Sequence, residues 1–435
     1  MVEINVRQSV FYPDEPGRDF ITVRGLIMRH AATPWAPPTA EQIGLLGTHW
    51  SKGWVIEDNV ISHSVCTGVT LGKHGDEFDN TSANTAEGYV ETIRRAHAFE
   101  IPWTKDRVGS HVVRRNHISH CEQAGLVGSM GPAFSIIEDN VIHDIHMRAL
   151  FGGAEMAGIK LHGAVDGVIR GNHIYRANMG LWLDWMAQGT RVSSNLFHDN
   201  RGQDLFMEVN HGPFLIDNNL FLSPTSLLDV SQGGAYVHNL FAGRIVSFPE
   251  RGRETPYHPA HSTQVAGLAL TTGGDNRFYN NIFVGIGQPP TPEERAAVGA
   301  VTHSSGYGLW GYDARDFASY AAGNVYYFGA QPYAGEEDAV VQPDHDPAIE
   351  VVHEAGEVRV DADWGDALAE ADTATVTTEL LGLAEVADVP YETADGEPIE
   401  IDFDYLGEPR DGADPTPGPL ADAGTGAGSW LVWPH

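Results

Sequence analysis

Residues 180–212 read GLWLDWMAQGTRVSSNLFHDNRGQDLFMEVNHG, and within this stretch one apolar pattern occurs twice. The runs GLWLD and DLFME each end in a carboxylate, Asp184 and Glu208, 24 positions apart. A chain that winds as a coil of that period brings the strands of successive turns to about 4.8 Å from each other, so side chains at equivalent positions stack. The stretch therefore predicts a coiled scaffold on which Asp184 and Glu208 face each other across one rung.

A short motif centred on asparagine recurs along the chain. An apolar pair and a polar residue precede the asparagine, and two apolar residues follow it, as in VIEDNVI, VIRGNHI and LIDNNLF. The asparagines are Asn59, Asn116, Asn140, Asn172, Asn195, Asn219, Asn239, Asn281 and Asn324. Their closest spacings are 20 to 24 residues, and insertions account for the longer gaps.

This period predicts an all-β fold, a right-handed parallel β-helix in which equivalent asparagines form a ladder from coil to coil. A leucine-rich repeat has a similar period, but its Leu-x-x-Leu-x-Leu frame is missing. A propeller needs a period near 40 residues. The 49 glycines and 25 prolines are scattered at turn-like intervals, which also favours short strands joined by tight corners.

The sequence predicts one long domain with additions. Residues 1–330 form the β-helix, and residues 73–110 interrupt it with a helix-like segment that is either a wall of the binding groove or a surface excursion. The first coil has no capping helix before it, so we expect a longer parent chain, a homo-oligomer or an N-terminal partner region to cover that end. Residues 331–435 are predicted as an irregular acidic segment that packs on the end of the β-helix.

Charge and cysteine content limit the compartment and the partners. The net charge is −33, and residues 331–435 hold 26 acidic residues against Arg359 and Arg410. Such a surface repels nucleic acid, anionic lipid and polyuronate chains, which favours a small neutral saccharide as the partner, although solubility or a salty habitat also explains the charge. No long apolar run or secretion signal occurs, and Cys66 and Cys121 are too few for a disulfide framework, so we expect a cytoplasmic protein with two buried thiols.

Aligning the third strand of successive coils on its apolar residues gives a polar column. The column reads His162, Asp184, Glu208, Asp229 and Thr271. Strand alternation places these residues on the outer face together with Trp182 and Phe206, while Leu161, Leu183, Met207 and Leu228 point inward. A slip of one residue would reverse every assignment.

Stacked carboxylates repel each other, so an ordinary solvated surface would avoid this column. A retaining glycosidase instead needs two carboxyl groups about 5 to 5.5 Å apart, which adjacent rungs supply. His162 next to Asp184 favours the ionised nucleophile, and the acidic neighbours Asp184 and Asp229 favour a protonated Glu208 as acid/base. Acids on an outer strand face are also often plain surface residues.

Five residues are candidates for substrate binding, and His162 of the polar column is one of them. Trp182 offers an aromatic face to a sugar ring, Asn210 and His211 offer hydrogen bonds to hydroxyl groups, and Glu155 is either at the groove or in a structural turn. The 21 histidines form no HExxH or similar motif, so no metal site is predicted. Nucleotide-binding glycine motifs are also absent, and no cofactor is expected.

Four stretches resemble glycoside hydrolase family 120, a family of retaining β-xylosidases. They are TAEQIGLLGTHWSKGWVIEDN (39–59), GGAEMAGIKLHG (152–163), GLWLDWMAQGTRVSSNLFHDN (180–200) and DLFMEVNHGPFLIDNNLF (204–221). The resemblance implies a parallel β-helix with the nucleophile at Asp184 and the acid/base at Glu208. The family carries earlier coils and an inserted β-sandwich before the region where this sequence begins.

The residues and the resemblance together favour a retaining exo-glycosidase that releases xylose from β-xylosides or short xylo-oligosaccharides. Two alternatives stay open. One is another β-helix carbohydrate enzyme such as a polysaccharide lyase, which would want cations beside a uronate. The other is a non-catalytic carbohydrate-binding solenoid, or a half-enzyme that needs a partner chain.

Overall fold

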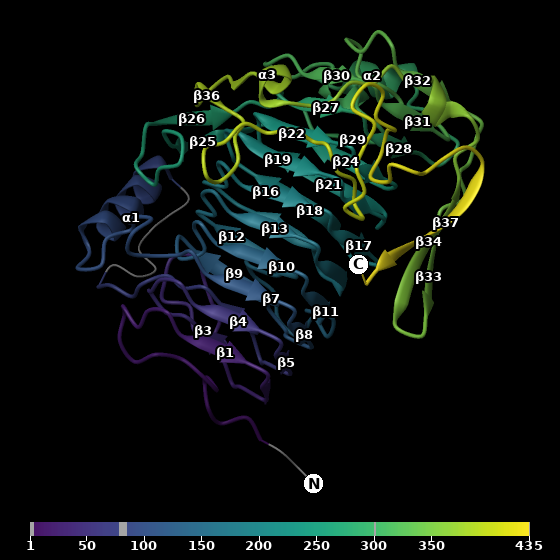
Figure 1. The fold of residues 1–435 in the computed structure, drawn as a ribbon. Coiled ribbons are helices and arrows are strands. Elements are labelled where there is room, and N and C mark those ends of the chain that lie inside the picture. The colour runs from purple at the N-terminus through teal and green to yellow at the C-terminus, as the bar shows by residue number, and fades with distance from the viewer. Residues whose placement is uncertain (1–3, 78–84, 300–301, 435) are drawn as a thin grey trace.

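The computed structural model describes residues 4–77, 85–299 and 302–434. Its main body is a stack of coils whose strands line up in three long sheets (Figure 1). Within each sheet a strand pairs in parallel with the equivalent strand of the next coil, except at one edge. The predicted all-β, parallel β-helix fold is therefore confirmed.

The bounds of the strands in each sheet follow the order of the coils. The first sheet contains β1 (Thr22–Arg24), β4 (Val55–Glu57), β7 (Val112–Arg114), β10 (Ile136–Glu138), β13 (Val168–Arg170), β16 (Arg191–Ser193), β19 (Phe214–Asp217), β22 (Gly234–Val237), β27 (Arg277–Tyr279) and β30 (Tyr320–Ala322). The second contains β2 (Ile27–Arg29), β5 (Val60–Ser62), β8 (His117–Ser119), β11 (Val141–Ile145), β14 (His173–Ala177), β17 (Leu196–His198), β20 (Leu220–Phe221), β23 (Leu240–Phe241), β28 (Ile282–Val284), β31 (Val325–Tyr327) and β32 (Val340–Gln342). The third contains β3 (Leu46–Gly47), β6 (Val69–Thr70), β9 (Leu126–Ser129), β12 (Ile159–His162), β15 (Leu181–Leu183), β18 (Gln203–Glu208), β21 (Thr225–Val230), β24 (Arg244–Ser247) and the antiparallel edge strand β29 (Ser304–Gly306).

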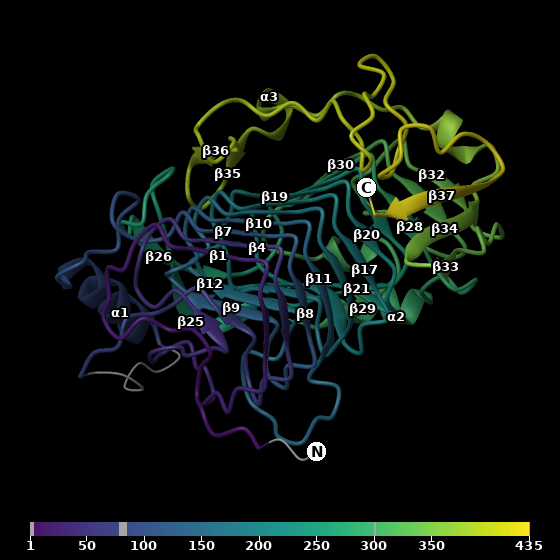
Figure 2. The same ribbon diagram turned by 60° about the horizontal axis from the view of Figure 1, so that its bottom comes forward.

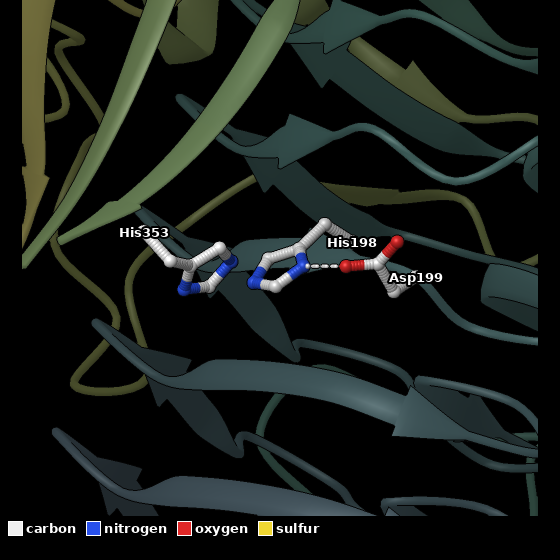
Figure 3. Close-up of side chains that lie close together, drawn as sticks. All are labelled: His198, Asp199 and His353. Carbon is white, nitrogen blue, oxygen red and sulfur yellow. Dashed lines mark hydrogen bonds and ion pairs between the residues drawn. The ribbon is translucent and has the colours of Figure 1, made fainter. Parts of the chain in front are cut away.

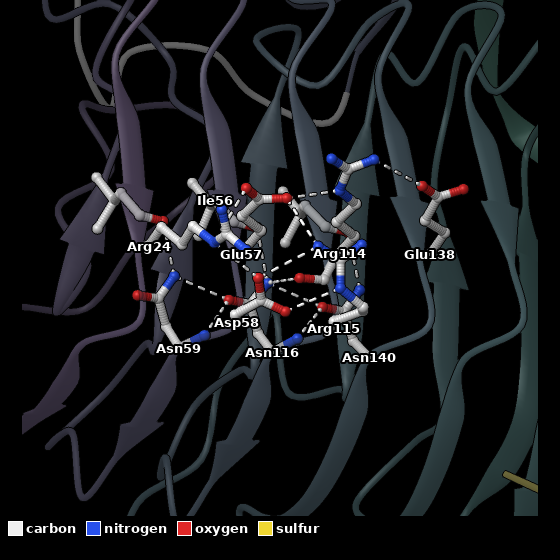
Figure 4. A network of polar contacts seen from close by, with 12 residues as sticks. Arg24, Ile56, Glu57, Asp58, Asn59, Arg114, Arg115, Asn116, Glu138 and Asn140 are labelled. Carbon is white, nitrogen blue, oxygen red and sulfur yellow. Dashed lines mark hydrogen bonds and ion pairs between the residues drawn. The ribbon is translucent and has the colours of Figure 1, made fainter.

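The repeated asparagines form a hydrogen-bonded ladder at the corner between the first and second sheets. Figure 4 shows three of its rungs, Asn59, Asn116 and Asn140. Each side-chain amide donates to the amide oxygen of the next asparagine at 2.9 to 3.1 Å, and the last, Asn324, donates to Glu336 at 2.8 Å. The residue before each asparagine has a left-handed backbone with φ between 52° and 66°, which makes the corner tight. The repeat in the sequence is thus one corner, used in nine coils.

Replacing Asn195 by Ala should destabilise the fold by about 3 kcal/mol, because several buried backbone and side-chain groups would lose their partners. Asn195 is fully buried, its amide donates to Asn219 and to the Ile169 carbonyl, and its oxygen accepts from Asn172. Urea unfolding of the variant measures the loss. Asn178→Ala is the matched control, because Asn178 is half-buried and donates only one side-chain bond, to Met156. Equal midpoints for the two variants would contradict the structural role of the ladder.

Inward-facing apolar residues of all three sheets form one continuous core. The inward positions of the second sheet change from isoleucine in the early coils to aromatic residues in the later ones. Five of these rings stack in one column at 5.0 to 5.2 Å between centroids, namely Phe197, Phe221, Phe241, Phe283 and Tyr326. Cys66 and Cys121 are buried free thiols, as the sequence predicts.

Two insertions lie over the outer face of the third sheet. The helix predicted within residues 73–110 is α1 (Ala86–Ala98), which begins after Thr85, whose hydroxyl caps it. A hairpin of β25 (Glu250–Tyr257) and β26 (Gly267–Thr271) lies beside it. The buried side of α1 packs with Trp185 and Phe206 of the third-sheet coils in a second apolar cluster. None of the described helices is long and apolar enough to span a membrane.

Residues after 342 lie along the flanks of the later coils, whereas the sequence predicts that residues 331–435 pack on the end (Figure 2). The first part, with β32 and Glu336, covers the last rung of the stack, and residues 367–370 also contact β32. An antiparallel sheet of β33 (Glu350–Glu354), β34 (Glu357–Asp363) and β37 (Ala427–Trp433) buries apolar residues against the second sheet. The physical reason is that these coils carry outward-facing leucines such as Leu196, Leu220 and Leu240, which need a cover.

The remaining elements are short. They are α2 (Pro292–Ala297), α3 (Thr378–Leu381), β35 (Leu383–Ala384), β36 (Val389–Pro390), η1 (Trp310–Tyr312) and η2 (Ala367–Glu370). The segment around α3, β35 and β36 covers the outer face of the first sheet through Val376, Tyr391 and Ile401.

Candidate active site

Asp184 and Glu208 occupy equivalent positions on neighbouring rungs of the third sheet. Strands β15 and β18 pair in parallel with Leu183 opposite Met207, and each carboxylate follows directly. Leu183 and Met207 point into the core, so strand alternation turns both acids outward. Both line a cavity of about 180 Å³ on the outer face of this sheet.

Two cationic or polar groups of the preceding coil hold Asp184. Lys160 Nζ donates to Asp184 Oδ2 at 2.7 Å, and His162 Nε2 lies 2.8 Å from the same oxygen. Trp185 N donates to the other carboxylate oxygen at 2.8 Å. Burial by itself would raise the pKa of Asp184, but the charges of Lys160 and then His162 outweigh it and hold that pKa well below its usual range. Asp184 is therefore a buried, ionised carboxylate.

Lys160 is a site residue that the sequence analysis missed. It lies on β12 opposite Trp182 in the register, and its ammonium is 3.9 Å from the centroid of the Trp182 ring. Its side chain is 1% exposed. The run GIKLH contains the signal, because alternation places Lys160 and His162 on the same outer face, but the column of last positions in each strand does not include it.

Glu208 has different surroundings. Trp182 Nε1 donates to Glu208 Oε2 at 2.9 Å, and Arg253 of β25 donates to Oε1 at 2.8 Å. Burial and then the negative charge of Asp184 raise the pKa of Glu208 to about 7, although Lys160 and Arg253 oppose this shift. The cavity therefore holds one carboxylate that is ionised and one carboxyl group that keeps its proton close to neutral pH.

The cavity has walls from outside the third sheet. Helix α1 contributes Tyr89 and Thr92, and the ring of Tyr89 lies 4.3 Å from that of Trp185. The Tyr89 hydroxyl also contacts the Arg253 guanidinium. Helix α1 of the insertion is therefore a wall of the groove, which is one of the two alternatives that the sequence left open.

Glu155 also reaches the cavity. Its side chain is 1% exposed, and its Oε1 lies 3.5 Å from Lys160 Nζ. Its Oε2 lies 3.9 Å from His162 Nδ1. His162, Trp182 and Glu155, three of the five predicted binding residues, thus gather around Asp184 and Glu208.

The other two predicted binding residues, Asn210 and His211, lie outside the cavity lining, which corrects the sequence analysis. Asn210 is buried at a corner after β18, where its amide donates to the Leu183 carbonyl and its oxygen accepts from Ala187 N. His211 is buried beside Thr255, whose hydroxyl is 2.9 Å from its Nε2. Both residues follow the strand at the point where the chain turns away from the groove, so their polar groups serve the corner.

The polar column is shorter than predicted, because the alignment of β21 predicted from the sequence is one residue away from its pairing with β18. Asp229 pairs with Met207, and Val230 pairs with Glu208. Asp229 therefore points inward, where it accepts hydrogen bonds from Tyr312 at 2.8 Å and Ser231 N at 3.0 Å. Leu228 correspondingly lies on the outer side with Trp182 and Phe206, not in the core.

Thr271, the last predicted member of the column, belongs to another structure. It ends β26 in the hairpin, where it pairs with Glu250. The strand that follows β21 in the third sheet is β24, which lies earlier in the sequence than GLALT. The sequence analysis placed GLALT in the column because of the spacing of its apolar residues. That spacing is the same in a strand of a coil and in a hairpin inserted between coils, so it could not distinguish the two.

Comparison with known proteins agrees with this architecture. A family model described as a right-handed β-helix region matches residues 43–243, so the hand of the helix is the predicted one. XylC, whose structure is described as a complex with xylose, is 39% identical in sequence to this chain and superposes with a TM-score of 0.89. The alignment covers 98% of this chain and 69% of XylC.

The chain belongs to the family of XylC. No curated protein matches the sequence.

Proposed function

We propose that this protein is a retaining β-xylosidase of glycoside hydrolase family 120, which releases xylose from β-xylosides or short xylo-oligosaccharides. The observation that carries the proposal is the pair of carboxyl groups on adjacent rungs of one cavity, whose surroundings shift their pKa values in opposite directions. Adjacent rungs are about 4.8 Å apart, which is close to the separation of about 5 to 5.5 Å between the two carboxyl groups of retaining enzymes. The similarity to XylC, described in complex with xylose, supports the sugar.

The reaction would proceed by double displacement. The Asp184 carboxylate attacks the anomeric carbon, the bond to the leaving oxygen breaks, and Glu208 gives its proton to that oxygen. The ionised Glu208 then takes a proton from water, which attacks the anomeric carbon, breaks the ester to Asp184 and releases the sugar with retained configuration. Lys160 and His162 keep Asp184 ionised before each turnover.

The walls of the cavity fit a small neutral saccharide. Trp185 and Tyr89 line the cavity with aromatic rings, and Glu155 and His162 offer hydrogen bonds to the hydroxyl groups of a sugar. The Trp182 ring lies between Lys160 and Phe206, so its contribution to the cavity is its edge. The chemistry uses two carboxyl groups and water, so it needs no cofactor.

Proton NMR of the reaction with an aryl β-xyloside tests the proposal. We expect β-xylose to appear first and to convert slowly to the α anomer, because two displacements restore the configuration. An aryl β-glucoside serves as the comparison substrate, since it differs by the extra hydroxymethyl group. First appearance of α-xylose would refute the retaining mechanism, and no turnover of any aryl glycoside at any pH would refute the enzymatic function.

A further inference from the structure

A second group of titratable side chains lies on the outer face of the second sheet, away from the carboxylate pair. His173 and Tyr175 are two residues apart in β14 and so lie on the same face of the strand. His198 is opposite Tyr175 on the next rung, β17. The hairpin of β33 and β34 comes close to this face and brings His353 beside His198, with 4.8 Å between the ring centroids. Residues from two coils and from the C-terminal segment therefore meet at one place.

Three of these residues bring ligand atoms together. His198, Asp199 and His353 each offer one nitrogen or carboxylate oxygen, and these three atoms lie within 4.8 Å of one another (Figure 3). His198 is buried and fixed on its strand, whereas Asp199 and His353 are exposed and can turn toward an ion. Two imidazoles and a carboxylate are a ligand set that suits Zn²⁺ and related first-row metals.

The contacts of His198 decide how its ring would serve such an ion. Its Nδ1 lies 2.7 Å from Asp199 Oδ2, and its Nε2 lies 2.7 Å from His173 Nε2. An imidazole that binds a metal through one nitrogen usually gives the other N–H to a neighbouring acceptor, which fixes the ring. An ion bound to Nδ1 uses the lone pair of that nitrogen, so the single proton of the neutral ring lies on Nε2, directed at His173 Nε2.

The place is also accessible from outside. A surface cavity of about 360 Å³ lies between the second sheet and the hairpin, and His173, His353, Glu354, Glu357 and Trp433 are among its lining residues. Of the three ligands, His353 lines this cavity, and the carboxylates of Glu354 and Glu357, which also line it, add negative charge that attracts a cation.

We propose that His198, Asp199 and His353 bind a divalent transition-metal ion such as Zn²⁺, with His173 orienting His198, and that the ion fastens the β33–β34 hairpin to the β-helix. An ion bound by groups from both parts stabilises their contact, because it binds the folded arrangement and not the unfolded chain. The site is on a different sheet from Asp184 and Glu208, so it is independent of the proposed glycosidase reaction.

Calorimetric titration of the chelator-treated full chain with Zn²⁺ tests this site. We expect one ion per chain and a rise in Tm upon binding. His353→Ala removes one ligand from an exposed hairpin position and should weaken binding at least about 10-fold, as should Asp199→Asn. Co²⁺ in place of Zn²⁺ gives a visible spectrum that reports nitrogen and oxygen ligands, and this spectrum should be lost in His353→Ala.

The matched control is His120→Ala. His120 is also an exposed histidine near the second sheet, but it belongs to another group, stacked on His63 at 4.8 Å between centroids. Its replacement should leave Zn²⁺ affinity and Tm rise unchanged. No binding by the parent chain, unchanged binding by His353→Ala, or loss of the ion in His120→Ala would each overturn the proposal.

Discussion

Asp184→Asn should lower kcat/KM for an aryl β-xyloside by about 10⁴-fold, because the amide cannot attack the anomeric carbon. The substitution keeps the shape of the side chain, so the fold and the cavity should persist. It also removes the negative charge that raises the pKa of Glu208, and the remaining activity should therefore have a different pH dependence. Steady-state kinetics with purified variant and parent measure both effects.

Reaction with an added nucleophile distinguishes a catalytic nucleophile from a carboxylate that has only a structural role. In Asp184→Ala, added azide has room to attack the anomeric carbon from the side that Asp184 occupied, and it should yield the α-glycosyl azide. Glu254→Gln is the control, since Glu254 is an exposed acid on the strand that carries Arg253. Turnover by Asp184→Asn at the parent's rate, or an equal loss in Glu254→Gln, would contradict the assignment.

The asparagine repeat made the fold predictable from sequence. Each asparagine marks one corner, and the same hydrogen bond repeats in each coil, so a local pattern carries the whole architecture. The 24-residue interval between Asp184 and Glu208 works for the same reason, because one coil separates them without a bulge. Where each occurrence of a sequence motif corresponds to one coil, the sequence is sufficient to predict the fold.

The predictions were wrong where one local sequence pattern is compatible with two structures. In β21, Asp229 lies one position before Val230, the residue that pairs with Glu208. The sequence analysis aligned Asp229 with Glu208 because both are acids, but the strand pairing does not have this register. Asn210 resembles a residue that could bind a sugar, but it is a corner asparagine of a second kind, bonded to Leu183 and Ala187. Neither difference is visible in spacing alone.

Contacts made by residues from distant segments of the chain could not be predicted from the sequence either. Arg253 contacts Glu208 from a hairpin inserted two coils later, and no periodicity connects the two. The flanking position of the C-terminal sheet depends in the same way on the outward-facing leucines of the second sheet, which the coil pattern counts only as apolar.

The pH dependence of the parent enzyme should be governed by Glu208 on its alkaline side. The first chemical step needs Glu208 protonated, and its pKa is raised to about 7, so kcat/KM should fall as the pH rises through that value. The pKa of Asp184 is held well below its usual range, so loss of the nucleophile by protonation should occur only in strongly acidic solution. We expect a broad plateau at acidic pH and one alkaline limb.

Glu208→Gln should remove this alkaline limb and lower kcat/KM for xylobiose by about 10³-fold, because the leaving sugar needs a proton that glutamine cannot give. A dinitrophenyl β-xyloside should lose much less in the bond-breaking step, since its leaving group departs as a stable anion without protonation. Asp229→Asn is the control, because burial raises the pKa of Asp229 to about 6 but its carboxyl group points into the core. If the limb persists in Glu208→Gln, or if Asp229→Asn removes it, the proton donor is another group; if both substrates lose activity equally, Glu208 does not protonate the leaving oxygen.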